Sequence, residues 1–190
     1  MLAGVLVYAM SASVDGFIND RDGGFAWTPP DDELFGVHLA RVSGLGGYLL
    51  GRRLYEAMLP WETDPAMRAD EARTAFADVW TALPKVVFSR TLRGVQGNAR
   101  LAQGSVAEEV AAVLAGADGD VEIGGAGLAG QAFMLGLVDE LRIFRHPVVV
   151  GGGTPHLPPV LDQVQLDLVE TRTFASRVVY ERYRRLGLSR

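Results

Sequence analysis

A glycine-rich turn directly follows an apolar run in the stretch Val121–Gly130. Glycine lets a backbone approach an anion closely, and the free N–H groups of a helix's first turn point at a ligand from the positive end of the helix dipole. Residues Gly125–Gly130 also match the G-x-G-x-x-G pattern of dinucleotide-binding turns. We predict a phosphate site here, although small residues at this spacing also suit close packing of a helix on a sheet.

Two further apolar runs end in groups that bind anions. Gly51 is followed by Arg52 and Arg53 at the start of an expected helix, and the run 85–88 ends in Ser89 and Arg90. Arginine binds phosphate through two parallel hydrogen bonds and serine adds a hydroxyl donor, so Ser89 and Arg90 suit a terminal phosphate such as the 2′-phosphate of NADPH. The alternative is that these arginines are solvated surface charges.

Few side chains are candidates for catalysis. Asp15 stands in an Asp-Gly pair after the first expected strand, where an acid with a raised pKa could donate a proton, or where it could simply form a turn. Trp27 could cover a flat ring by stacking, or pack in the core. The histidines at 38, 146 and 156 lie far apart on different elements, so the sequence indicates neither a metal triad nor a Ser-His pair.

Strands and helices alternate along the first two thirds of the chain, and strands dominate the last third. Alternation predicts parallel strands joined by right-handed crossovers, with ligands at the carboxyl ends of the strands. We therefore predict an α/β fold in three layers, with a mixed, mostly parallel sheet, helices on both faces and a C-terminal antiparallel hairpin. The expected strands span 2–9, 47–50, 85–88, 100–102, 119–123, 141–150, 166–174 and 178–183, and the expected helices span 31–43, 52–59, 65–83, 105–115 and 127–135.

Length and composition limit the function further. The chain has 190 residues, a formal net charge of −5 and no cysteine. These features predict one domain over residues 1–190 and argue against a nucleic-acid surface, disulfides and cysteine-based zinc sites. The basic segment 182–185 is interpreted as a solvated strand edge. No apolar run reaches about 18 residues, so we expect a cytoplasmic protein that neither spans nor binds a membrane.

Taken in order, six motifs resemble the stand-alone form of one family, the C-terminal reductase domain of the bifunctional riboflavin-biosynthesis deaminase/reductase, which is itself dihydrofolate-reductase-like. The resemblance covers about residues 5–183, which is nearly the whole chain. The motifs are Ser13–Ile18, Gly51–Glu56, Pro84–Leu92, Ile123–Leu128, Gly136–Leu141 and Val150–Pro155.

The resemblance implies a dihydrofolate-reductase-like fold with NADPH in a groove across the strand ends. It implies an NADPH-dependent reductase of a small carbonyl, imine, pterin-like or pyrimidine substrate, related to 5-amino-6-(5-phosphoribosylamino)uracil reductase, and a homodimer. Trp27 is the candidate substrate contact and Asp15 the candidate catalytic residue. The residues implied in cofactor binding are Gly51, Arg52, Arg53, Ser89, Arg90, Gly124, Gly125, Ala126, Gly127 and Leu128.

The chain departs from the resembling proteins in two respects. The deaminase half of the bifunctional enzyme needs a P-C-x-x-C zinc element, which a chain without cysteine lacks. Dihydrofolate reductases carry a carboxylate inside the helix after the mobile loop, where this chain has Leu34–Val37, and the acids at 31–33 suit the helix cap instead. Two alternatives to the reductase therefore stay open: a non-catalytic or regulatory NADPH-binding protein, and a dihydrofolate reductase.

Overall fold

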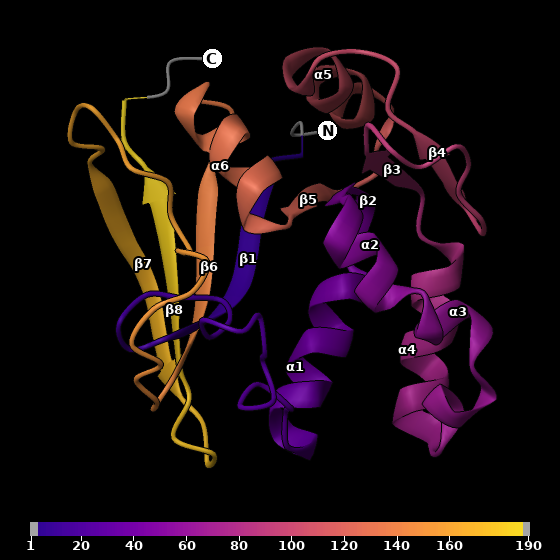
Figure 1. Ribbon diagram of the computed structural model, residues 1–190, viewed down its shortest axis with the longest axis horizontal. Coiled ribbons are helices and arrows are strands. Elements are labelled where there is room, and N and C mark those ends of the chain that lie inside the picture. The colour runs from indigo at the N-terminus through magenta and orange to yellow at the C-terminus, as the bar shows by residue number, and fades with distance from the viewer. Residues whose placement is uncertain (1–3, 188–190) are drawn as a thin grey trace.

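An eight-stranded sheet runs through the computed structural model, which describes residues 4–187 (Figure 1). The strand order is β4-β3-β2-β5-β1-β6-β8-β7; β8 runs antiparallel to β6 and β7, and the remaining pairs are parallel. This arrangement confirms the predicted mixed sheet and C-terminal hairpin. The strands are β1 Leu6–Ser13, β2 Leu45–Gly51, β3 Lys85–Phe88, β4 Ala99–Leu101, β5 Asp120–Gly124, β6 Glu140–His146, β7 Leu166–Thr173 and β8 Val179–Arg185.

Helices cover both faces of the sheet, as predicted. In Figure 1, α5 and α6 lie at the top, α1 and α4 at the bottom, and the strands from β7 to β4 run from left to right between them. The helices are α1 Asp32–Ser43, α2 Arg52–Met58, α3 Pro60–Thr63, the 3₁₀ turn η1 Pro65–Arg68, α4 Glu71–Ala82, α5 Val106–Gly116 and α6 Ala126–Met134.

Local capping explains where two of these helices start. The Asp31 side chain accepts a hydrogen bond from the Leu34 N–H at 2.9 Å and caps α1. Ser105 and Glu108 form a capping box at α5, each bonding the other's backbone N–H. A side chain that satisfies free N–H groups fixes the first residue of a helix, so both starts are as predicted.

The predicted boundaries differ from the observed ones at several places. The helix expected over 65–83 is divided into η1 and α4, because the Asp70 side chain accepts from the Arg73 N–H and caps a new helix. The first strand begins at Leu6 rather than residue 2, and residues 2 and 3 lie outside the described part of the chain. Pro60 starts α3 directly after α2 instead of ending the helical segment, because proline fits the first turn of a helix. Strand β6 ends at His146, before Pro147, which has no N–H for the sheet.

The alternation of side chains along β1 divides the core between the two faces. Leu6 and Tyr8 pack with Leu128 and Phe133 of α6, while the opposite face carries Tyr48 and the side chains that pack under α1 and α4. Both clusters are buried. The face under α1 and α4 also holds buried charge, described below with the site.

The basic C-terminal segment is not a sheet edge, contrary to the prediction, because β8 lies between β6 and β7. Arg182 donates to the buried Glu140 at 2.7 Å. The edge is β7, on which Leu168 and Val169 are 52% and 39% exposed. The homodimer stays a prediction that light scattering can measure. No helix among residues 4–187 combines the length and the apolar character needed to cross a membrane.

Candidate active site

Two of the predicted anion-binding segments meet at the carboxyl edge of the sheet. Strands β2 and β5 are neighbours, and their ends lead into α2 and α6. A β-carbon at Gly125 would lie 3.6 Å from both the N and the Cα of Gly51. The glycines that start α2 and α6 are therefore in contact, although they are 74 positions apart in sequence, at 51 and 125.

The turn into α6 has the backbone geometry of an anion site. Gly125 has φ +88°, a conformation that favours glycine, and its carbonyl accepts the N–H groups of Leu128 and Ala129. The N–H groups of Ala126 and Gly127 belong to the first turn, where a helix offers no internal acceptor. A β-carbon at Gly127 would meet nothing within 4 Å. The exposed backbone of this first turn is open to a ligand.

Two of the predicted cofactor residues pack inside the protein instead. A β-carbon at Gly124 would collide with the Leu54 side chain and lie 2.9 Å from the Tyr48 hydroxyl, and Leu128 is buried in the core beside α6. The N–H of Leu128 is already used within the turn. Packing between the helices and the sheet accounts for both residues, and their part in cofactor binding stays a prediction.

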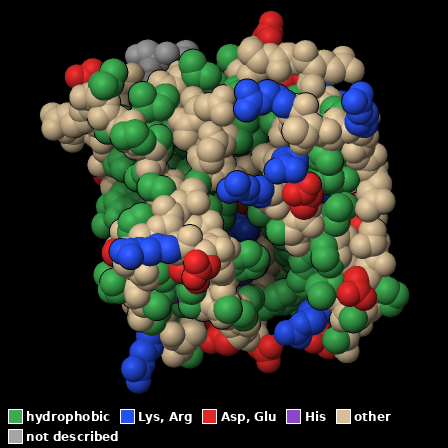
Figure 2. All heavy atoms as spheres, viewed as in Figure 1, with side chains coloured by type: hydrophobic (Ala, Val, Ile, Leu, Met, Phe, Trp, Pro, Cys, Tyr) green, Lys and Arg blue, Asp and Glu red, His purple; other side chains and the backbone are tan. Residues whose placement is uncertain are grey.

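The predicted basic residues follow the ends of the neighbouring strands β2 and β3 on the surface. Arg52, Arg53 and Arg90 are exposed, and Arg52 lies 3.7 Å from Glu56 one helical turn later. The Ser89 hydroxyl oxygen accepts from the N–H groups of Thr91 and Leu92 and so shapes the loop that presents Arg90. Figure 2 shows Lys and Arg side chains gathered around a hollow near the middle of this face.

Asp15 does not have the raised pKa that proton donation would favour. Its carboxylate accepts from the N–H groups of Val150 and Gly151, at 3.2 and 2.8 Å, on an exposed surface. The hydrogen bond from Ser13 and these two backbone bonds lower the pKa of Asp15. The contacts favour the turn interpretation: Asp15 is ionised and ties the loop after β1 to the loop after β6.

A Ser-His pair that the sequence does not indicate lies at the ends of β1 and β6. His146 Nε2 is 3.2 Å from Ser11 Oγ, and the Trp27 ring packs edge-on against His146 with centroids 5.4 Å apart. Because β1 lies between β5 and β6, the serine of this pair and the glycine turn that ends β5 belong to neighbouring strands. Trp27 is half-buried, and its indole N–H is buried without a partner among the described residues.

A second histidine lies close to this pair, on α1. The His38 ring packs against Phe144 in a tilted arrangement with centroids 4.5 Å apart, and its Nδ1 is buried and unpartnered within residues 4–187. Burial, followed by the charges of Arg41 and His146, lowers the pKa of His38 to about 3, and burial lowers that of His146 as well. Both imidazoles are therefore neutral at pH 7. Two buried donors or acceptors without partners, on Trp27 and His38, border the same region.

No carboxylate from the start of α1 enters this region. Asp31 caps the helix, Asp32 is exposed, and Glu33 pairs with Arg172 at 2.6 Å. The expectation that these acids serve the helix cap is confirmed for Asp31. The region under α1 is bordered by His38 rather than by an acid. No group of three or more metal-ligating side chains forms in the described chain.

The sheet order, the helices on both faces and the likeness to solved structures define an α/β protein with a dihydrofolate-reductase-like fold. The chain belongs to the family of the RibD C-terminal domain, whose family model matches residues 5–180. Its relative YyaP from Bacillus subtilis (strain 168), an uncharacterized protein, is 31% identical over 179 residues, which cover 92% of this chain and 91% of YyaP.

Solved structures share the fold. A candidate riboflavin biosynthesis protein from Shewanella sp. PV-4 has a TM-score of 0.78 at 21% identity, covering 96% of this chain and 99% of that one. The Thermotoga maritima deaminase/5-amino-6-(5-phosphoribosylamino)uracil reductase has a TM-score of 0.67 at 14% identity, covering 96% of this chain but 57% of that one. Dihydrofolate reductase from Enterococcus faecalis, complexed with NADP(H), has a TM-score of 0.65 at 17% identity, covering 97% and 98%.

Proposed function

We propose that this protein is an NADPH-dependent reductase of a small, neutral ring compound that carries a carbonyl or imine group. The observation that carries the proposal is the juxtaposition at the carboxyl edge of the sheet. The open glycine turn of α6 follows β5, and the neighbouring strand β1 carries the serine of a Ser-His pair that packs against a half-buried tryptophan. The family and the reductase-like fold support the same reaction class.

The cofactor side of the proposal depends on groups that fit a dinucleotide. Gly125, Ala126 and Gly127 would hold the pyrophosphate on backbone N–H groups, with Gly51 against them. Arg52 and Arg53 would neutralise its charge, and Ser89 and Arg90 would hold the 2′-phosphate. When bound, NADPH supplies the hydride.

The substrate side depends on neutral hydrogen-bonding groups. Ser11 and His146 would bind the carbonyl oxygen or imine nitrogen, and the Trp27 N–H and His38 Nδ1 would take the further polar atoms of the ring. A buried polar atom without a partner is costly, so a substrate that satisfies both atoms gains affinity. Because the region holds no acid from α1, a folate-type substrate that needs a carboxylate partner is disfavoured.

The alternative is a regulatory protein that binds NADPH without turnover. The neutral Ser11–His146 pair favours the reductase, because a pure binder needs no polar pair at this position. NADPH oxidation in the presence of carbonyl, imine and pyrimidine compounds separates the two, since a binder shows affinity but no oxidation with any of them.

The first test concerns cofactor choice. NADPH should bind more tightly than NADH, and Arg90→Ala should reduce that difference about ten- to a hundredfold, because one exposed charge-assisted contact to the 2′-phosphate is lost. Titration calorimetry with both cofactors measures it. Arg93→Ala, a change of another exposed arginine in the same loop, is the control. Equal affinities in the unmutated protein would overturn the assignment.

The second test concerns the Ser-His pair. His146→Ala should lower kcat about tenfold, because one positioned hydrogen bond to the substrate is lost, while the Kd for NADPH stays unchanged. Steady-state kinetics on an active compound from the panel measure this, with Ser11→Ala expected to act in the same direction. A fall in NADPH affinity or melting temperature without a change in kcat would show that His146 is only structural.

A further inference from the structure

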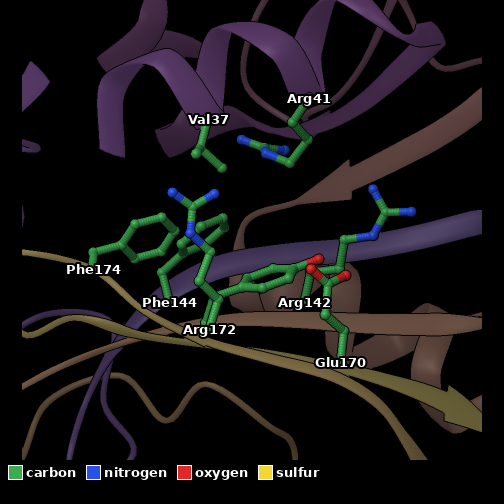
Figure 3. A pocket seen from close by; sticks show the side chains of 8 residues that line it. Val37, Arg41, Arg142, Phe144, Glu170, Arg172 and Phe174 are labelled. Carbon is green, nitrogen blue, oxygen red and sulfur yellow. The ribbon is translucent and has the colours of Figure 1, made fainter. Parts of the chain in front are cut away.

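A separate hollow lies on the flank of α1 away from α4, between that helix and strands β6, β8 and β7. Its volume is about 230 Å³, below the range of about 300–1,000 Å³ that suits drug-sized ligands. Figure 3 shows Val37 and Arg41 descending from α1 toward Phe144, Phe174 and Arg172 below. None of the predicted cofactor residues lines it.

Aromatic rings form the inner wall of this pocket. Phe144 and Phe174 are 1% and 3% exposed, and the Tyr180 ring centroid lies 5.1 Å from that of Phe144. Val37 covers the wall from α1. The outline therefore suits one flat ring, because aromatic rings pack well in stacked or tilted pairs.

Three arginines line the same pocket, and their partners leave donors unused. Arg41 donates Nη1 to Glu122, but its Nε is buried and has no partner among the described residues. Arg142 bonds Glu140 and Asp120 through Nε and Nη2 only. A guanidinium has five N–H donors, so each group can bind an anion as well as its present partner.

The third arginine, Arg172, contacts both the aromatic wall and an acidic side chain of α1. It stacks over Phe174 with its Cζ 4.5 Å from the ring centroid, and Nη2 donates to Glu33 at 2.6 Å. Its side chain is 48% exposed, so its remaining donors face the open side of the pocket. A ligand with its carboxylate between Arg41 and Arg172 would place its ring against Val37 and Tyr180.

Glu170 is the single carboxylate that lines the pocket. It forms no salt bridge within the described chain, and in Figure 3 its carboxylate lies on the same side of the pocket as Arg142. Its charge would repel a second negative group on a ligand. The pocket is therefore suited to an acid with one negative charge rather than to a phosphate or a dicarboxylate.

We propose that this pocket binds a small aromatic or heteroaromatic monocarboxylic acid, with its ring against Val37 and Tyr180, over the buried Phe144, and its carboxylate between Arg41 and Arg172. The site is separate from the proposed cofactor groove and is independent of the proposed reductase function. Phe144 contacts His38 on one side and Tyr180 on the other, so a ligand here lies one ring away from the proposed substrate region.

Benzoate serves as the probe, in an NMR titration of the full chain with acetate and benzyl alcohol as comparators. Benzoate should bind with a millimolar or tighter Kd and shift Val37 and Phe144 signals, and both comparators should bind about tenfold more weakly or worse, because each lacks the ring or the charge. Equal binding of acetate or benzyl alcohol, or no benzoate shifts at these residues, would overturn the proposal.

Variants that are expected to change benzoate affinity in opposite directions test whether the ligand binds in this pocket. Arg172→Gln should weaken benzoate binding about tenfold, whereas Glu170→Gln should strengthen it severalfold because a repelling charge is removed. Val37→Phe, which fills the pocket without changing charge, should abolish binding, and Arg90→Ala is the control expected to leave it unchanged. If Glu170→Gln weakens binding, or Val37→Phe leaves it intact in a folded protein, the pocket is not the site. NADPH affinity should stay constant in Arg172→Gln, Glu170→Gln and Val37→Phe, and a protein that binds benzoate but not NADPH would contradict the proposed function alone.

Discussion

Glu122→Ala is expected to lower the free energy of unfolding by about 3–5 kcal/mol, a large part of the roughly 5–15 kcal/mol available to a domain. Glu122 is fully buried in the middle of β5. It accepts from the Tyr48 hydroxyl at 2.6 Å and pairs with Arg41 of α1. Burial raises the pKa of the Tyr48 hydroxyl, and the Glu122 carboxylate raises it further, so the hydroxyl remains a donor.

The size of this effect comes from the groups left behind. Removing the carboxylate leaves the Arg41 guanidinium and the Tyr48 hydroxyl buried without an acceptor, and a buried unpaired charge costs far more than the pair contributes. Urea denaturation measures the loss. The control is Asp78→Ala, which breaks an exposed pair with Arg68 and should cost only about 0–1 kcal/mol.

A double replacement distinguishes how much of the lost stability comes from the unpaired charge and how much from the lost packing. Arg41→Met combined with Glu122→Met should recover most of the loss seen in Glu122→Ala, because an apolar pair of similar volume often replaces a buried ion pair without penalty. A loss in Glu122→Ala no larger than that in Asp78→Ala would show that the pair contributes little. The double variant would also remove the ion pair that joins α1 to β5, while His38 and Val37 are left unmutated.

Interactions between residues close in sequence made much of the fold predictable. The starts of α1 and α5 follow from Asp31 and from the Ser105/Glu108 box, because a cap acts over three residues. The alternation of strands and helices is also a local pattern, and it predicted the parallel sheet. Boundaries failed where a proline had two possible roles, as at Pro60, which starts α3 rather than ending a helix.

The candidate site was predictable only where it depends on single turns. The glycine turn at Gly125 could be read directly, but the contact between Ser11 and His146 joins residues 135 positions apart and depends on β1 pairing with β6. Because such pairing is not visible in the sequence, the histidines at 38, 146 and 156 seemed unrelated to any serine or to one another. Glu122 carried a signal that was missed: an acid inside an otherwise apolar strand needs a buried partner.

The same limit applies to Asp15 and to the basic segment of β8. An Asp-Gly pair predicts a turn, and the Ser13 hydrogen bond, which lowers the pKa of Asp15 most, is local, but the backbone N–H groups that lower it further come from the loop after β6. Arg182 looked solvated because its partner, Glu140, lies on a neighbouring strand 42 residues earlier. The surroundings of both residues depend on contacts between segments that are far apart in sequence, and a single sequence does not reveal such contacts.

Gly127→Asp is expected to weaken NADPH binding by several hundredfold, about 3–4 kcal/mol, because it places a carboxylate beside the proposed pyrophosphate site, where like charges cost several kcal/mol. The substitution should not harm the apo protein. A β-carbon at Gly127 meets nothing within 4 Å, and aspartate in the first turn of a helix is favourable to the helix dipole. The melting temperature without cofactor should therefore stay the same or rise.

Gly125 does not offer so clean a test, although it is the centre of the motif. Its φ of +88° strains any residue with a β-carbon, so Gly125→Ala should destabilise the apo protein whether or not a ligand binds. Gly127 distinguishes ligand binding from packing, because a β-carbon added there meets no protein atom within 4 Å and would meet only a bound ligand. Calorimetric titration with NADPH, together with apo melting curves, measures both quantities on one variant. Gly127→Ala is the matched control, since it adds the β-carbon without the charge. If Gly127→Asp binds NADPH as tightly as Gly127→Ala does, the turn serves only to pack α6 on the sheet, and the pyrophosphate assignment is wrong.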